Sequence, residues 1–182
     1  IKDDLANDLG VEAWFATGSP GQRIIGFGNA HEGRSANYDR HVFLNDAGQL
    51  VFGVWNDSGS HTVTTAGTYA DGGWHHVVGT MGASGMALYV DGVLAGTDPT
   101  TVPQAYTGHW RVGTDNTWSG SGEFTGRIDE AAVYSTVLSA ERVAAHHAAS
   151  LVSNAAPLAD FSATCTGASC ELVATASDPD GS

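Results

Sequence analysis

Three short stretches of the sequence place an aromatic ring beside side chains that can form several hydrogen bonds. They read Tyr-Asp-Arg-His from position 38, Trp-Asn-Asp from position 55 and Asp-Asn-Thr-Trp from position 115. An aromatic ring can stack on the apolar face of a sugar while neighbouring polar groups hydrogen-bond its hydroxyls. We therefore predict a carbohydrate-binding site, with these candidate residues: Tyr38, Asp39, Arg40, Trp55, Asn56, Asp115, Asn116 and Trp118.

The same rings also permit a purely structural interpretation. Aromatic residues near turns commonly pack beneath loops, and Tyr106 and Trp110 stand in similar turn-rich stretches. For any single residue, sugar binding and packing stay alternatives. The chain as a whole could instead be a structural or protein-interaction module that packs on a neighbouring catalytic domain of the same polypeptide.

The carboxylates do not form the pattern expected of a polysaccharide-cleaving enzyme. A retaining glycosidase holds two carboxyl groups roughly 5–5.5 Å apart, which a strand supplies through acidic residues on one face. Glu12 has no acidic neighbour at such a spacing, and Asp129 and Glu130 are adjacent and so point to opposite faces. A Gly-x-Ser-x-Gly elbow is also absent from the sequence. We predict no catalytic residues, and a hydrolase or lyase is the least favoured of the three functions.

The histidines do not have the spacing of a zinc site. Four of the eight form two adjacent pairs, His75-His76 in a predicted strand and His146-His147 in a predicted helix. Neighbouring side chains diverge in both kinds of element, so neither pair can bind one ion together.

Charge and cysteine content indicate where the protein works. The net charge is −13 with seven Lys and Arg, which argues against nucleic acid as a partner, and no apolar run is long enough for a membrane span. Cys165 and Cys170 enclose four residues between two short strand-like segments, a spacing that favours a disulfide across a hairpin over a zinc or redox motif. A disulfide implies an oxidising compartment, and we therefore predict a secreted or cell-surface protein.

The pattern of alternating apolar residues and turns predicts an all-β protein, an antiparallel sandwich or jelly roll. One short helix is predicted after Ser139, a favourable N-cap. Asp91-Gly92 suits a type I′ turn. The predicted strands cover residues 10–16, 23–29, 39–44, 49–56, 61–65, 74–81, 86–90, 93–96, 110–113 and 123–134.

Three motifs in this order resemble the laminin-G-like jelly rolls of the concanavalin A-like lectin and glucanase superfamily, in their secreted bacterial form. They are GVEAWFATGSP near the start, DGGWHHVVGT followed by GMALYVDGVLAG in the middle, and FTGRIDEAAVYSTVLSAERVAAHH near the end. The family's usual first strands are absent or reduced upstream of the first motif. The resemblance implies a core that includes the following residues: Trp14, Phe15, Trp74, Leu88 and Tyr134.

The resemblance also implies a structural calcium ion. In related jelly rolls an acidic residue of the last strand, which Asp129 resembles, binds Ca²⁺ together with groups of the N-terminal strand. Oxygen ligands are those that calcium requires, and Asp3, Asp4 and Asp8 are candidate partners by composition. Asp129 could equally cap a turn or pair with an arginine.

The last segment, PLADFSATCTGASCELVATASDPDGS, resembles the start of a polycystic-kidney-disease-type (PKD) domain, an immunoglobulin-like sandwich. We therefore expect a jelly roll over residues 1–152, a linker over 153–157 and the first strands of a second, truncated domain over 158–182. Taken together, the residues and the resemblance predict a non-catalytic, extracellular, carbohydrate-binding module of a larger protein, possessing a structural calcium ion.

Overall fold

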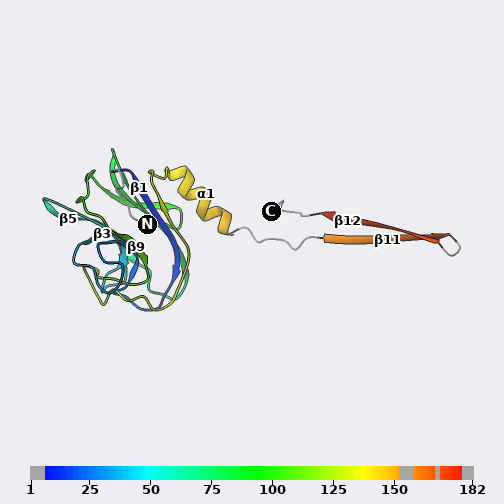
Figure 1. Ribbon diagram of the computed structural model, residues 1–182, viewed down its shortest axis with the longest axis horizontal. Coiled ribbons are helices and arrows are strands. Elements are labelled where there is room, and N and C mark those ends of the chain that lie inside the picture. Colours follow the sequence, from blue (N-terminus) through cyan, green and yellow to red (C-terminus); the bar gives the residue numbers. More distant parts are fainter. Residues whose placement is uncertain (1–6, 152–157, 167–168, 178–182) are drawn as a thin grey trace. The chain divides into compact units, whose positions relative to one another are not determined.

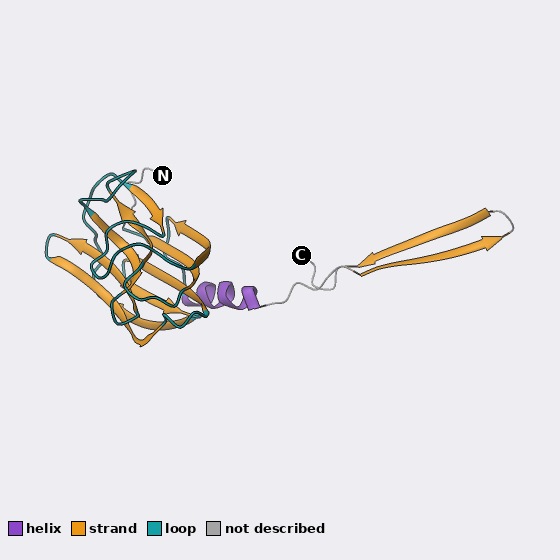
Figure 2. Ribbon diagram, turned by 90° about the horizontal axis from the view of Figure 1, so that it is seen from below, coloured by secondary structure: helices purple, strands orange, loops and turns teal. Residues whose placement is uncertain are grey.

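The computed structural model describes residues 7–151, 158–166 and 169–177, with side chains described for residues 7–150. Contacts divide the chain into two units, Ile1–His147 and Ala148–Ser182. The first unit contains two antiparallel five-stranded sheets, with the single helix near its end (Figures 1 and 2). The predicted sandwich is thus confirmed.

Sheet A has the strand order β10-β1-β6-β7-β8, and sheet B has the order β5-β4-β3-β2-β9. The strands of sheet A are β1 (Leu9–Ala16), β6 (Trp74–Gly82), β7 (Gly85–Val90), β8 (Val93–Asp98) and β10 (Arg127–Tyr134). Those of sheet B are β2 (Arg23–Gly28), β3 (Tyr38–Leu44), β4 (Gln49–Asn56), β5 (Gly59–Thr68) and β9 (His109–Val112).

The predicted strand boundaries agree closely with the structure except at the last strand of the sandwich. That strand was expected from residue 123, but β10 begins at Arg127. Gly122 and Gly126 both have positive φ angles, 74° and 145°, which are incompatible with a continuous strand. Residues 113–126 instead form a long loop between β9 and β10.

The core lies between the inner faces of the two sheets. Alternate residues of β1, from Leu9 to Phe15, meet Leu50, Phe52 and Val54 of β4, and all are buried. Gly79 of β6 leaves room for the Phe52 ring, because a Cβ at this position would lie 2.8 Å from that ring. The period of two in the sequence therefore reflects burial of one face of each strand.

The helix α1 (Ala140–Leu151) covers the outer face of sheet A. It begins at Ser139, whose Oγ accepts a hydrogen bond from the backbone N–H of Arg142 at 3.3 Å, as expected of an N-cap. Leu138 and Val143 pack there against Val78. In the described part of the chain, no helix has the length and apolar character needed to cross a membrane.

The turn between β7 and β8 has the predicted geometry. Asp91 and Gly92 have φ angles of 50° and 78°, both positive as a type I′ turn requires. The Asp91 carboxylate accepts a hydrogen bond from the backbone N–H of His76 at 2.8 Å and contacts Nδ1 of His75 at 2.9 Å. The turn is therefore tied to β6 as well as to its own strands.

The core prediction was wrong for two aromatic residues, Trp74 and Trp14. Phe15 and Leu88 are fully buried, whereas Trp74 is 41% exposed. Trp74 is the first residue of β6, where the sandwich ends, and the guanidinium of Arg127 lies 5.0 Å from its ring centroid. Trp14 is half-buried on the outer face, stacked on His76 at 5.0 Å.

The second unit contains a hairpin of β11 (Leu158–Thr166) and β12 (Ser169–Ser177). Cys165 and Cys170 are direct partners in its register. Their side chains lie outside the described ones, as does the expected linker at 153–157. The disulfide and the PKD assignment stay predictions.

Candidate functional site

The outer face of sheet B carries the rings predicted from the sequence. In β4 the side chains of Leu50, Phe52 and Val54 point into the core, so Gly53 and Trp55 face outward. Trp55 lies near the end of the strand and is 44% exposed. The strand therefore presents an indole ring at the border of the sheet.

A second indole comes from the long loop between β9 and β10. Trp118 lies directly over Gly53, where a Cβ would come within 2.5 Å of its ring. Its centroid is 6.3 Å from that of Trp55 at an interplanar angle of 67°, and 4.5 Å from the ring of His41. His41 is fully buried, which holds its pKa well below the ordinary value, and Arg23 adds to this effect. Within the described residues, neither ring nitrogen of His41 has a hydrogen-bond partner.

A hollow of about 370 Å³ is lined in part by these two rings. Asn37 and Gln104 contribute to its wall, and no described residue hydrogen-bonds the side-chain amide of either. The volume is within the range of roughly 300–1,000 Å³ typical of small-molecule sites. The complete lining is Ala36, Asn37, Tyr38, Trp55, Gln104 and Trp118. We call this hollow the aromatic subsite; it combines flat apolar surfaces with free hydrogen-bonding groups.

A second hollow, of about 650 Å³, is lined by the turn after β4 and by the segment before Tyr106. Its lining is Asn56, Asp57, Ser58, Val102, Pro103, Gln104 and Ala105. The Asn56 amide is already used: its oxygen accepts hydrogen bonds from Ser58, and its nitrogen donates to the Val102 carbonyl at 3.2 Å. We call this hollow the polar subsite.

Asp39 and Arg40 lie beneath the aromatic subsite rather than in it. Asp39 is fully buried and accepts hydrogen bonds from the Tyr106 hydroxyl at 2.8 Å and the Trp55 backbone N–H at 3.2 Å. Arg40 pairs with Asp39 at 3.4 Å and donates to the Gln104 carbonyl. Burial raises the pKa of Asp39, and Arg40 and Tyr106 counteract this in part. These two predicted site residues therefore fix the backbone positions of Trp55 and Gln104.

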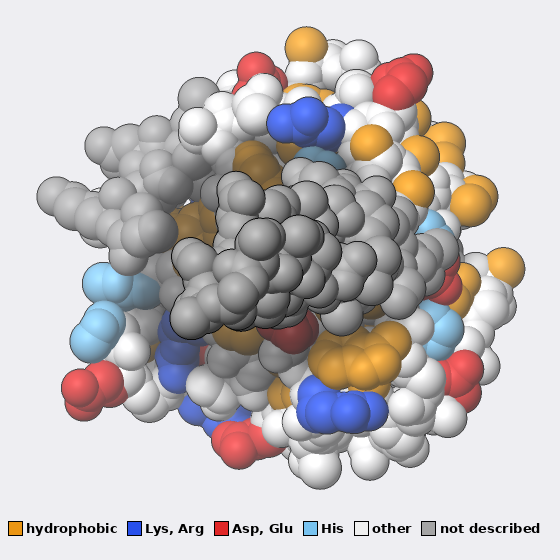
Figure 3. All heavy atoms as spheres, turned by 90° about the vertical axis from the view of Figure 1, so that its right-hand side faces the viewer, with side chains coloured by type: hydrophobic (Ala, Val, Ile, Leu, Met, Phe, Trp, Pro, Cys, Tyr) orange, Lys and Arg blue, Asp and Glu red, His pale blue; other side chains and the backbone are white. Residues whose placement is uncertain are grey.

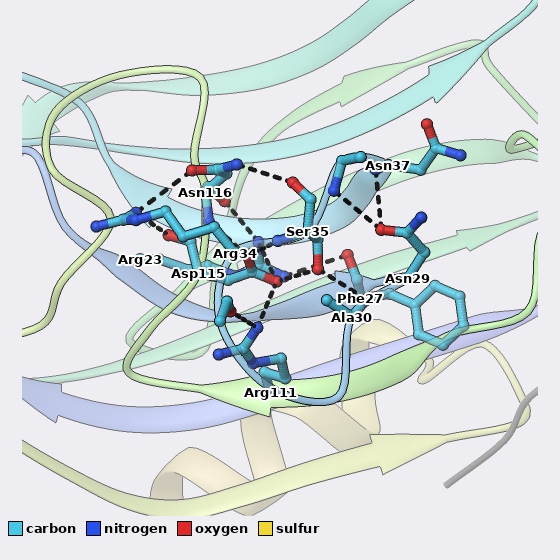
Figure 4. Close-up of polar contacts among 12 residues, drawn as sticks. Arg23, Phe27, Asn29, Ala30, Arg34, Ser35, Asn37, Arg111, Asp115 and Asn116 are labelled. Atoms are coloured by element: carbon cyan, nitrogen blue, oxygen red, sulfur yellow. Dashed lines mark hydrogen bonds and ion pairs between the residues drawn. The ribbon is translucent and has the colours of Figure 1, made fainter.

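Asp115 holds the loop that carries Trp118 (Figure 4). It is fully buried, and its carboxylate accepts hydrogen bonds from the Ser35 N–H at 2.7 Å, the Ser35 hydroxyl at 2.6 Å and the Asn116 N–H at 2.7 Å. Arg111 lies 3.3 Å away. Burial alone would raise the pKa of Asp115, but these donors and Arg23 hold it below its ordinary value.

Arg23 anchors the same loop from beneath. Its fully buried guanidinium donates to the carbonyls of Asn116 at 2.6 Å and Phe27 at 3.2 Å, and it lies 3.9 Å from the Asp115 carboxylate. Burial lowers its pKa to about 10, so that it remains a cation at neutral pH. The Asn116 amide donates to the Ser35 carbonyl at 2.8 Å, so Asn116 also supports the loop.

The eight predicted binding residues thus separate into two groups. Tyr38, Trp55 and Trp118 line the aromatic subsite and Asn56 the polar one, while Asp39, Arg40, Asp115 and Asn116 hold these in place. The sequence analysis missed Asn37 and Gln104. Asn37 adjoins a predicted residue and could have been included, but no local pattern marks Gln104.

The expected calcium ligand lies far from these hollows in the fold, on β10 of sheet A. Asp129 is exposed, and its Oδ1 accepts a hydrogen bond from the Glu130 backbone N–H at 2.9 Å. No group of three or more His, Cys, Asp or Glu among the described residues could hold a metal ion. Asp3 and Asp4 lie outside the described residues, so the calcium ion stays a prediction.

Glu12 lies on the outer face of sheet A, under α1. Its carboxylate accepts hydrogen bonds from Tyr134 at 2.6 Å and contacts ring nitrogens of His76 and His146 at 2.7 and 2.9 Å. Burial alone would raise its pKa, but these three partners lower it to about 2. The sequence analysis saw Glu12 as isolated and missed this cluster. The predicted divergence of His75 and His76 is confirmed, since His75 contacts Asp91 instead.

Two facing five-stranded antiparallel sheets with a ligand-sized hollow on one outer face define a lectin-like β-sandwich. The family described as the concanavalin A-like lectin/glucanases superfamily, a laminin G type, matches residues 2–144. The chain belongs to this family. Laminin G and concanavalin A-like domains are typical of extracellular proteins, and the family name also covers glucanases.

Several solved structures share the fold at low sequence identity. The CBM40 of the Ruminococcus gnavus IT-sialidase, bound to α2,3-sialyllactose, has a TM-score of 0.59 and 17% identity over 77% of this chain and 82% of that one. Mouse laminin α1 domains LG4-5 have a TM-score of 0.57 and 21% identity over 77% of this chain and 39% of that one. A search of curated proteins found no match.

A third similar structure is domain 4 of AbnA, an extracellular arabinanase of Geobacillus stearothermophilus, in complex with arabinotriose. Its TM-score is 0.50 and its identity 19%, over 76% of this chain and 66% of that one. The chain also spans 38% of the binding domain of a paraclostridial mosquitocidal protein. These likenesses show the fold, and the neighbours include carbohydrate-binding modules.

Proposed function

We propose that the chain is a non-catalytic carbohydrate-binding module of a larger secreted protein. One observation carries this proposal: Trp55 and Trp118 line a hollow together with Asn37 and Gln104, whose side-chain amides have no hydrogen-bond partner among the described residues. Indole rings offer flat surfaces for the C–H faces of a sugar, and free amides offer both donors and acceptors for its hydroxyls. The sugar ligands of the sialidase and arabinanase modules support the same assignment.

The absence of catalysis is part of the proposal. Glycoside cleavage needs two carboxyl groups, in retaining enzymes roughly 5–5.5 Å apart. Asp57 is the single carboxylate that lines either hollow, and the Glu12 carboxylate is buried on the other sheet with three partners. Neither has the paired arrangement that a hydrolase requires.

The proposal is tested by affinity electrophoresis of the chain in gels that contain soluble polysaccharides, with and without Ca²⁺. Trp55→Ala should weaken retention by about tenfold or more, as loss of a central aromatic contact does in other sites. Trp74→Ala is the matched control, because Trp74 is similarly exposed but lies on sheet A. If the unmodified chain is retained by no polysaccharide in either condition, the proposal is wrong.

Three further features complete the proposed module. Asp129 would help to bind a structural Ca²⁺, Cys165 and Cys170 would form a disulfide, and residues 158–182 would begin a PKD-type domain. The register pairing of the two cysteines supports the disulfide. Mass spectrometry of the unreduced protein tests it, since bond formation removes two hydrogen atoms.

A second candidate function is attachment to a protein, either a neighbouring catalytic domain or another partner. It is favoured by β8, an edge strand of sheet A on which Val93 is 68% and Leu94 51% exposed. Exposed edge strands can pair with another chain. Figure 3 shows one face of the molecule, on which hydrophobic side chains gather at the upper right and in a further patch below the centre, among scattered charged side chains. Leu94→Asp should weaken a protein contact here and leave sugar binding unchanged.

A further inference from the structure

The two hollows on sheet B meet at one residue. Gln104 lines both of them, and Trp55 and Asn56, which line one each, are consecutive in β4. A ligand long enough to extend beyond the aromatic subsite would therefore enter the polar one. The two subsites adjoin at Gln104 near the end of β4, and we call them together the groove.

Gln104, which separates the two subsites, is hydrogen-bonded to the end of β4. The Gln104 backbone N–H donates to the Trp55 carbonyl at 2.6 Å, and its carbonyl accepts from Arg40. The Asn56 amide adds a hydrogen bond to the Val102 carbonyl. Because backbone groups on both sides of Gln104 are fixed, the two subsites keep a constant spacing, which suits a chain of linked sugars.

The charges around the groove disfavour acidic glycans. Asp57 is the one charged side chain that lines either subsite, and it is exposed. No arginine or lysine lines the groove, and the nearby Arg40 is committed to Asp39 and Gln104. An anionic sugar would meet repulsion from Asp57 and would find no cation to pair with.

We infer that the groove binds a neutral, linear oligosaccharide that spans both subsites, rather than a single terminal sugar or an acidic glycan. This inference rests on the proposed function. One sugar unit would stack on an indole ring of the aromatic subsite, and the following units would pass Gln104 toward Asp57 and Ser58. Asp57 would accept hydrogen bonds from sugar hydroxyls and repel carboxylated sugars.

Isothermal titration calorimetry with defined sugars tests the inference on the complete chain. The neutral probes are arabinotriose, xylotriose, cellotriose, mannotriose and maltotriose, and the acidic probes are 3′-sialyllactose and trigalacturonic acid. We expect the tightest ligand to be neutral, and its affinity to exceed that of the corresponding monosaccharide by about tenfold or more, the gain from a second occupied subsite.

Two variants at Asp57 test the charge argument, and both are tolerated by an exposed turn. Asp57→Lys should raise the affinity for an acidic probe relative to the best neutral one by about fivefold to tenfold at low salt, and Asp57→Asn by less. Glu130→Lys changes the net charge equally from an exposed position in β10 of sheet A and should leave the ratio unchanged.

The outcomes separate this inference from the proposal on which it rests. If an acidic probe binds most tightly, or if a monosaccharide binds as tightly as its trisaccharide, the inference is wrong while carbohydrate binding stands. An unchanged ratio in Asp57→Lys also overturns it. If no probe of either kind binds, the proposed function itself fails.

Discussion

The two outer faces of the sandwich are covered in different ways. On sheet A, α1 lies over Glu12, and every contact of that carboxylate is made by a protein side chain. On sheet B, the loop between β9 and β10 lies over Gly53 and His41, but its Trp118 leaves a hollow beside Trp55. The cover on sheet A pairs the Glu12 carboxylate, whereas the cover on sheet B leaves apolar rings and amides open.

The two outer faces use their buried polar groups in different ways. A buried carboxylate is costly unless its oxygens are hydrogen-bonded, and both oxygens of Glu12 have partners under α1, although Nδ1 of His76 has none among the described residues. On sheet B the buried charges, Asp115 and Arg23, are paired beneath the loop, and the groups above them remain available. A hollow therefore forms where buried polar groups hold a loop without filling the space above it.

The largest effect is expected from Asp115→Ala, which should disrupt the loop that covers the outer face of sheet B. It leaves the buried Arg23 without a counter-charge and Ser35 without its acceptor, a change that costs about 3–5 kcal/mol in other proteins. Urea unfolding should show this loss. Glycan binding should also weaken, because the loop that presents Trp118 loses its anchor. A variant as stable as the unmodified chain would show that Asp115 does not hold the loop.

The second-largest effect is expected on lowering the pH, and it concerns Glu12 on sheet A. The pKa of Glu12 is about 2 in the folded protein, against an ordinary value of 4.5. A lowered pKa means that this carboxylate stabilises the fold above pH 4.5, and that the contribution is lost as the pH falls from 4.5 toward 2. The difference corresponds to about 3 kcal/mol.

The measurement compares unfolding free energies of the unmodified chain and Glu12→Gln between pH 7 and pH 2. The stability gap between the two should be widest at neutral pH and should narrow as Glu12 becomes protonated. Other carboxylates titrate equally in both proteins, so the comparison isolates Glu12. A gap that stays constant with pH would contradict the role given to this carboxylate.

The sequence predicted the outer face of sheet B better than that of sheet A, for a physical reason. Trp55 and Trp118 stand out because each is a large ring beside several hydrogen-bonding side chains, and the strand that carries Trp55 follows a period of two. The partners of Glu12 are 64, 122 and 134 residues away along the chain, so no local pattern reports them. The burial of Asp115 and Arg40 was missed similarly, since composition alone does not distinguish a buried, paired charge from an exposed one.

The smallest effect is expected from His146→Ala, which should loosen α1 over sheet A and leave the loop over sheet B unchanged. It removes the contact from α1 to Glu12 at 2.9 Å and should cost about 1 kcal/mol, as loss of one hydrogen bond does. His76 and Tyr134 still bind Glu12, so the sheet stays intact. Hydrogen exchange should become faster in α1 and stay unchanged in β3 and β4, and sugar affinity should not change. Arg142→Ala, an exposed change on the same helix, is the control. Altered exchange in sheet B would mean that the two covers are coupled rather than independent.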